Sequence, residues 1–190
     1  MTVFLLLALL LALPDGDPEP RTLAVAPAGE IRVDGILDED AWAGAEVASD
    51  FVQYEPAEGA PSSERTEVRV LRGADALIVG ARLWTDDPAT IRRTLSRRDD
   101  TGGADAFYVA LDSYNDDRTA YVFGVTAAGV QIDGLQEGGR TDESWDAVWS
   151  SVVTVGAEGW TAEIRIPYSQ LRFSGTSGTW GANFQRVMPA

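Results

Sequence analysis

The 190-residue chain contains no cysteine and no histidine, and all 15 of its basic residues are arginine. Without these two residue types the chain can form neither disulfide bonds nor zinc sites with thiolate or imidazole ligands. A Ser–His–Asp triad and Cys–His catalysis are excluded for the same reason. Carboxylates, hydroxyls, amides, guanidinium groups and aromatic rings remain, and a hard cation such as calcium can still bind to oxygen ligands.

Positive charge is scarce. The 30 acidic residues outnumber the 15 arginines, which gives a net charge of −15 and an isoelectric point of about 4.2. Nucleic acids and anionic lipid surfaces are bound by clustered basic side chains, so neither is expected as a partner.

Long apolar runs are also rare, and the longest is Val3–Leu13. This run is too short to cross a membrane but suits the core of a signal peptide, although no basic residue precedes it and no clear A-x-A cleavage site follows. A buried strand or helix is the alternative. We predict a signal peptide over residues 1–17, a linker over 18–29, and export to the periplasm, the outer membrane or the medium.

The stretch Asp105–Asp133 forms the centre of the predicted fold. Aromatic and β-branched residues alternate with a period of two in Asp105–Asp112 and again in Thr119–Thr126, which is typical of strands. The polar segment Ser113–Arg118 between them favours a turn, and a Gly turn leads to a third strand.

Short alternating segments separated by turn residues recur along the rest of the chain, and helices are expected only as connectors. We predict helical segments at Leu37–Ala43 and Asp86–Leu95, and a strand that begins at Trp145–Trp149. The pattern indicates one all-β domain, an antiparallel β-sandwich of jelly-roll or immunoglobulin-like type, over residues 30–190.

Five segments stand out when they are taken together. They are VDGILDEDAW (33–42), EVRVLRGADALIVGARLWTDDP (67–88), DAFYVALD (105–112), GWTAEIRIPYSQLRF (159–173) and WGANFQR (180–186). In combination they resemble the family-nine carbohydrate-binding-module-like domain, in particular the version at the N-terminus of large exported bacterial proteins. The resemblance implies a jelly-roll-like sandwich, glycan binding and a downstream domain of the same gene product, with the present domain truncated at its C-terminus.

The resemblance also implies where a sugar site would lie. Sugar-binding members hold a terminal sugar between two tryptophans, but the matching stretch before Asp105 is Thr101–Ala104, which has no aromatic residue. The family's acidic and arginine positions fall near Tyr108 and Gly124, whereas its amide pair is matched by Asn183 and Gln185. The resemblance therefore supports the fold more strongly than it supports the family's site for a terminal sugar.

A sugar site needs an aromatic face for the C–H side of the ring and planar polar groups for the hydroxyls. Packing in the core is the alternative for each aromatic residue taken alone, and a turn role is the alternative for Asp146. The predicted ligand-binding residues are Trp84, Tyr108, Trp145, Asp146, Trp149, Asn183 and Gln185.

Closely spaced acids suggest a calcium site, since carboxylates in a loop supply oxygen ligands. An exposed network of ion pairs with the neighbouring arginines is the alternative. The candidate ligands are Asp99, Asp100, Asp105 and Asp112; no other cofactor is indicated.

Nothing in the sequence marks a catalytic pair of carboxylates, because 30 acids produce chance pairs. We expect a non-catalytic, carbohydrate-binding-like module that takes a polysaccharide or oligosaccharide and serves polysaccharide breakdown, on its own or attached to a glycoside hydrolase or another envelope protein. The alternative is a structural domain that packs on a downstream, membrane-associated β-rich region and binds no sugar.

Overall fold

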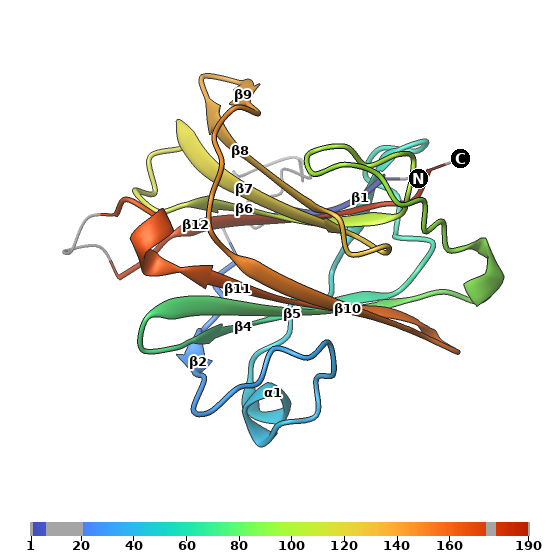
Figure 1. Cartoon of the computed structure of the whole chain (residues 1–190), viewed down its shortest axis with the longest axis horizontal. Helices are drawn as coiled ribbons and strands as arrows, with labels where there is room; N and C mark the ends of the chain where they lie inside the picture. Colours follow the sequence, from blue (N-terminus) through green and yellow to red (C-terminus); the bar gives the residue numbers. More distant parts are fainter. Residues whose placement is uncertain (1, 7–20, 174–177, 190) are drawn as a thin grey trace, which may run out of the picture.

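The computed structural model describes residues 2–6, 21–173 and 178–189. Two β-sheets pack face to face, as Figure 1 shows, so the predicted all-β sandwich is confirmed. The seven-stranded sheet has the order β3-β1-β12-β6-β7-β8-β9, and the five-stranded sheet has the order β10-β11-β5-β4-β2. All neighbouring strands are antiparallel except β2 and β4, which pair in parallel.

The strand bounds follow the alternating segments of the sequence closely. The strands are β1 (Thr2–Leu6), β2 (Ala26–Pro27), β3 (Val52–Glu55), β4 (Thr66–Arg72), β5 (Ala76–Trp84), β6 (Ala106–Asp112), β7 (Thr119–Thr126), β8 (Gln131–Glu137), β9 (Arg140–Asp142), β10 (Ser150–Gly156), β11 (Gly159–Pro167) and β12 (Gly181–Val187). Between them lie the helix α1 (Asp40–Gly44) and the single 3₁₀ turns η1 (Pro88–Thr90) and η2 (Tyr168–Gln170).

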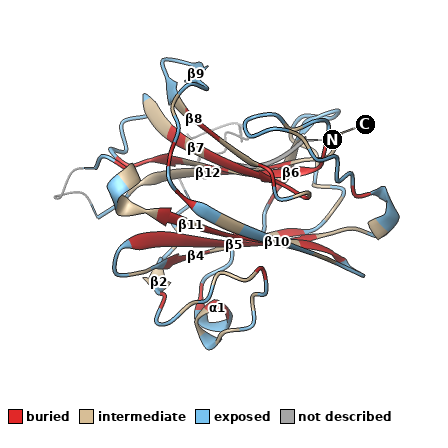
Figure 2. Cartoon of the chain, viewed as in Figure 1, coloured by how far each residue is buried: buried red, intermediate tan, exposed pale blue. Residues whose placement is uncertain are grey.

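Buried residues make up much of the central strands of both sheets (Figure 2), and their inward side chains form one core. Phe107, Val109 and Leu111 of β6 point into this core, and Phe123 of β7 and Phe184 of β12 lie opposite or beside them. The strands predicted at the centre of the fold are β6, β7 and β8, which are neighbours in the seven-stranded sheet. β6 lies between β12 and β7, and its inward-pointing residues are all buried.

The turn between β6 and β7 is organised by Asp112. Its carboxylate accepts hydrogen bonds from the backbone N–H groups of Tyr114, Asp116 and Asp117, at 3.1, 2.8 and 2.7 Å. Asn115 and Asp117 adopt positive φ angles of 55° and 56°, which asparagine and aspartate tolerate better than most residues. The prediction of a turn at residues 113–118 is confirmed.

The segment around α1 covers part of the outer face of the five-stranded sheet, so β4 and β5 are buried on both sides around Leu71 and Ile78 (Figure 1). Trp42 is buried, as the sequence predicted, and its indole lies on β5 above Gly80. A methyl group at position 80 would come within 2.9 Å of the Trp42 ring and 2.8 Å of Leu37. Glycine at position 80 therefore lets the segment around α1, which we call the cover, lie close to the sheet.

Three predicted elements differ in the structure. Residues 86–95 form only the 3₁₀ turn η1, capped by Asp87, because Ile91 is buried while Leu95 is 79% exposed and no helical stripe forms. The helical turn predicted at Leu37–Ala43 begins later, at Asp40, with Glu39 as its N-cap. β10 begins at Ser150, and Trp145–Trp149 is irregular because Asp133 and Gln170 hold its backbone N–H groups.

The start of the predicted signal peptide forms β1, which pairs with β12 on one side and β3 on the other. The remainder of residues 1–17 lies outside the described residues, so the signal peptide stays a prediction. In the described part of the chain no helix has the length and hydropathy of a membrane span.

Candidate functional site

Three of the predicted ligand-binding residues meet on the outer face of the seven-stranded sheet. Gln185 of β12 pairs with Tyr108 of β6, which pairs in turn with Gly124 of β7. Two residues along each strand, and on the same face, Asn183 pairs with Ala110. Directly opposed residues have Cβ atoms about 4.5–5.5 Å apart, so the two amides and the phenol share one patch of surface.

Tyr108 lies across Gly124, and a side chain at position 124 would overlap its ring. The phenol is half-buried as a result. Burial raises the pKa of Tyr108 to about 12, and the carboxylate of Glu143 acts in the same direction. At neutral pH Tyr108 is therefore an uncharged hydroxyl that can donate to or accept from a ligand.

Asn183 lacks a partner for its side-chain carbonyl. In residues 21–173 and 178–189, no donor reaches the buried Asn183 Oδ1. A buried acceptor without a hydrogen bond costs free energy, and a hydroxyl group from a ligand would satisfy it.

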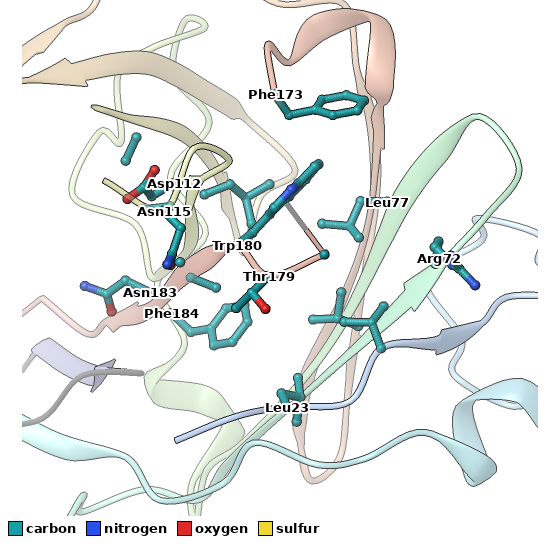
Figure 3. Close-up of a pocket in the computed structure, with 18 of the residues that line it drawn as sticks. Leu23, Arg72, Leu77, Asp112, Asn115, Phe173, Thr179, Trp180, Asn183 and Phe184 are labelled. Carbon is teal, nitrogen blue, oxygen red and sulfur yellow. The ribbon is translucent and has the colours of Figure 1, made fainter. Parts of the chain in front are cut away.

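A large hollow opens beside Asn183 at the end of the sandwich where β6 ends and β12 begins (Figure 3). Gly181 pairs with Asp112, which brings the turn after β6 next to the residues before β12. The hollow has a volume of about 1540 Å³ and reaches from Leu77 and Phe184, between the sheets, to Ala110 and Asn183 on the outer face. We call it the end hollow.

Three aromatic rings form one wall of the end hollow. The ring centroids of Phe173 and Trp180 are 5.2 Å apart, and Tyr168 lies 6.0 Å from Phe173 and 6.4 Å from Trp180. Phe173 is 43% exposed, whereas Trp180 and Tyr168 are half-buried. Figure 3 shows the Trp180 indole in the middle of the labelled side chains, with Asn115 and Asn183 on one side and Arg72 on the other.

The remaining predicted ligand residues lie elsewhere. Trp149 is buried edge-on against Phe123, and Trp145 packs on the same ring and on Tyr121. Trp149 belongs to the core cluster and the partly buried Trp145 packs against it, which matches the packing alternative rather than a ligand platform. Both indoles lie on the core side of β7, in the irregular segment that precedes β10.

Trp84 and Asp146 are held by arginines. The guanidinium of Arg65 lies 4.2 Å from the centre of the Trp84 ring, so this face of the indole is covered. Asp146 lies 3.1 Å from Arg98, whose guanidinium also pairs with the buried Asp133. Neither residue adjoins Tyr108, Asn183 and Gln185 in the pairing of the sheets.

The four predicted calcium ligands serve as turn and strand-end acids. Asp99 accepts from the N–H of Asp133, Asp100 accepts from the N–H of Gly102, and Asp112 holds its turn. Asp105 is buried, and this burial raises the pKa of its carboxyl group. Among the described residues no three acidic side chains come together as a metal site would require, so the calcium hypothesis gains no support.

Sequence reasoning missed Phe173, Trp180 and Asn115 as site candidates. Phe173 and Trp180 lie at the ends of two segments that carry the family resemblance, and Asn115 lies in the predicted turn, but none of the three was proposed as a ligand-binding residue. The signal that could have found them is the pairing of the end of β6 with the start of β12, which brings the two connections together.

No family model and no curated protein matches this sequence. Among solved structures, a family 9 carbohydrate-binding module from Caldicellulosiruptor kristjanssonii in complex with glucose aligns with a TM-score of 0.61 and 17% identity, over 87% of this chain and 84% of that chain. The complex with cellotriose aligns with a TM-score of 0.57 and 17% identity, over 86% and 82%. A Bacteroides uniformis protein inferred to bind carbohydrate aligns with a TM-score of 0.58 and 14% identity, over 76% and 74%. The chain thus has the fold of the family 9 carbohydrate-binding modules.

Proposed function

We propose that this chain is a saccharide-binding module, and that its site is the end hollow together with the adjoining patch of Tyr108, Asn183 and Gln185. One observation carries the proposal: an exposed aromatic wall stands beside an amide whose acceptor oxygen is unpartnered. Aromatic rings take the apolar face of a sugar, and amides bond its hydroxyl groups. The structural neighbours that bind glucose and cellotriose support the same class of ligand.

The site differs from a sandwich of two tryptophans around one sugar. Thr101–Ala104 supplies no ring, and Tyr168, Phe173 and Trp180 lie together on one wall of the end hollow rather than on two facing sides. The hollow also exceeds the roughly 300–1000 Å³ of a pocket for one small molecule, which leaves room for several sugar units. A polysaccharide or oligosaccharide is therefore the proposed ligand.

Retardation in native gels that contain soluble polysaccharides tests the proposal. We expect retardation by at least one polysaccharide, and Asn183→Ala should reduce it while thermal unfolding stays near that of the wild type. If none of a broad set of neutral and acidic polysaccharides retards the protein, the proposal is wrong.

We further propose that the module acts outside the cytoplasm in polysaccharide breakdown. The support is the apolar run Val3–Leu13, which suits a signal peptide, and the absence of cysteine and histidine, which leaves a fold independent of redox state. Fusing residues 1–29 to a reporter tests export directly. Cleavage near residue 17 and appearance of the reporter outside the cytoplasm are expected, and retention of an uncleaved fusion would contradict it.

A second candidate function, a structural domain that receives another β-rich region, is favoured by the position of β1. Cleavage of residues 1–17 would remove this strand and leave facing edges on β3 and β12. An open strand position of this kind accepts a further strand through backbone hydrogen bonds. Amide hydrogen exchange in β12, measured on a chain that starts at Pro18, would distinguish the structural domain from the saccharide-binding module. Fast exchange in Asn183–Val187 would indicate an open strand position beside β12. Slow exchange would indicate that no strand position is open.

A further inference from the structure

The described residues that line the end hollow are richer in arginine, relative to acids, than the chain as a whole. In the whole sequence acids outnumber basic residues by 30 to 15. The described residues that line the hollow include three arginines and two acids, namely Arg21, Arg72, Arg118, Asp112 and Asp117. Arg21 is paired with Asp50, so Arg72 and Arg118 balance the two acids of the lining in a chain whose net charge is −15.

Arg72 and Arg118 are available to a ligand. Arg72 ends β4 and Arg118 precedes β7, and both side chains are exposed. Among the described residues neither forms an ion pair, whereas Arg21 is paired with Asp50.

The acids of the hollow oppose this charge only in part. Both oxygens of Asp112 already accept backbone N–H groups, three in total, so this carboxylate is engaged in its turn. Asp117 is exposed and is the other described acid of the lining. Two further acids adjoin the hollow and are engaged as well: Asp116 accepts from the backbone N–H of Arg118 at 3.0 Å, and Asp75 pairs with Arg165.

A carboxylated sugar fits these groups. A guanidinium forms paired, charge-assisted hydrogen bonds with a carboxylate, and the aromatic wall of Phe173 and Trp180 takes the apolar side of the sugar ring. We propose that the end hollow selects an anionic polysaccharide built from uronic acid units, bound through Arg72 and Arg118. This inference rests on the proposed saccharide-binding function and specifies its ligand class.

Affinity electrophoresis with two polysaccharides at about 0.15 M salt tests it, with polygalacturonate as the acidic probe and hydroxyethylcellulose as the neutral one. We expect stronger retardation by polygalacturonate. Arg72→Gln and Arg118→Gln should each weaken this binding about tenfold, as the loss of a charge-assisted contact predicts. Arg93→Gln is the matched control, because Arg93 is exposed, forms no ion pair among the described residues and lies outside the described lining of the hollow.

The outcomes separate the two proposals. Retardation by hydroxyethylcellulose without stronger retardation by polygalacturonate overturns the acidic ligand and keeps the saccharide-binding function. Polygalacturonate binding that Arg72→Gln and Arg118→Gln leave at the level of Arg93→Gln also overturns the inference, because it places the anion elsewhere. Retardation by neither probe, nor by the broader set of polysaccharides, overturns both proposals.

Discussion

Glu163 on β11 accepts hydrogen bonds from the backbone N–H groups of Gly35, at 2.7 Å, and Asp34, at 2.8 Å. These residues are 128 and 129 positions apart in the sequence. Gly35 has a φ of +83°, and a side chain there would lie 2.7 Å from Thr154 Oγ1. These two hydrogen bonds therefore join residues 33–42 to residues 159–173, two of the segments that carry the family resemblance. They fix the cover on the five-stranded sheet.

The first prediction concerns the stability of this cover. Glu163→Ala removes the acceptor and leaves the two backbone N–H groups without a partner, so the free energy of unfolding should fall by about 1–3 kcal/mol. Urea unfolding measures the change. Glu158→Ala is the control, since Glu158 is exposed in the turn before β11 and should shift the midpoint little. Equal effects of the two substitutions would show that the bond does not hold the cover.

The second prediction concerns pH. Burial raises the pKa of Glu163 above its ordinary value of 4.5, and the nearby carboxylates of Glu39 and Asp34 act in the same direction, against the two backbone hydrogen bonds. The folded chain therefore holds this proton more tightly than the unfolded chain. Its contribution to stability is complete below the ordinary pKa and is lost as the pH rises through the raised pKa.

Glu163→Gln cannot titrate and removes this dependence. We expect the free energy of unfolding of the wild type to fall relative to that of the variant between about pH 4 and about pH 7. Urea unfolding at several pH values gives both curves. Parallel curves over this range would contradict the raised pKa.

Much of the fold could be predicted because alternation has a physical cause that acts locally. Strands such as β6 and β11 carry one buried face, and their residues show it directly. The predicted helix at 86–95 failed because the spacing of Ile91 and Leu95 suits a helix, yet only Ile91 found a place in the core.

The site was harder to predict because it depends on contacts between distant segments. Asn183 and Gln185 were found through the family resemblance and Tyr108 as a candidate aromatic face, and their pairing across β6 and β12 brings them together. The spacing of Trp145 and Trp149 places both on one face of a strand and suggested that one ring is open to a ligand, but this spacing cannot show that Phe123 packs against both. Phe173 and Trp180 lie in a connection whose neighbours are set by strand order, which no local pattern encodes.

The third prediction concerns the outer face of the seven-stranded sheet. Gly124→Ala would place a methyl group against the Tyr108 ring and push the phenol toward water. The pKa of Tyr108, about 12 in the wild type, should then fall toward its ordinary value of 10. Ultraviolet titration measures it, with Tyr108→Phe to assign the signal. Gly156→Ala meets no atom within 4 Å and serves as the control; an unchanged titration in Gly124→Ala would mean that the ring does not lie over position 124.

Saccharide binding by the aromatic wall of the end hollow is tested most directly by comparing the polysaccharide affinity of the wild type with those of Phe173→Ala and Leu95→Ala. Phe173 is an exposed ring of the end hollow, whereas Leu95 is an exposed apolar side chain outside its described lining. We expect gels to retard the wild type and Leu95→Ala equally, and Phe173→Ala to bind about three- to tenfold more weakly because an aromatic contact is lost. Equal binding by all three proteins, or binding by none, would contradict this expectation.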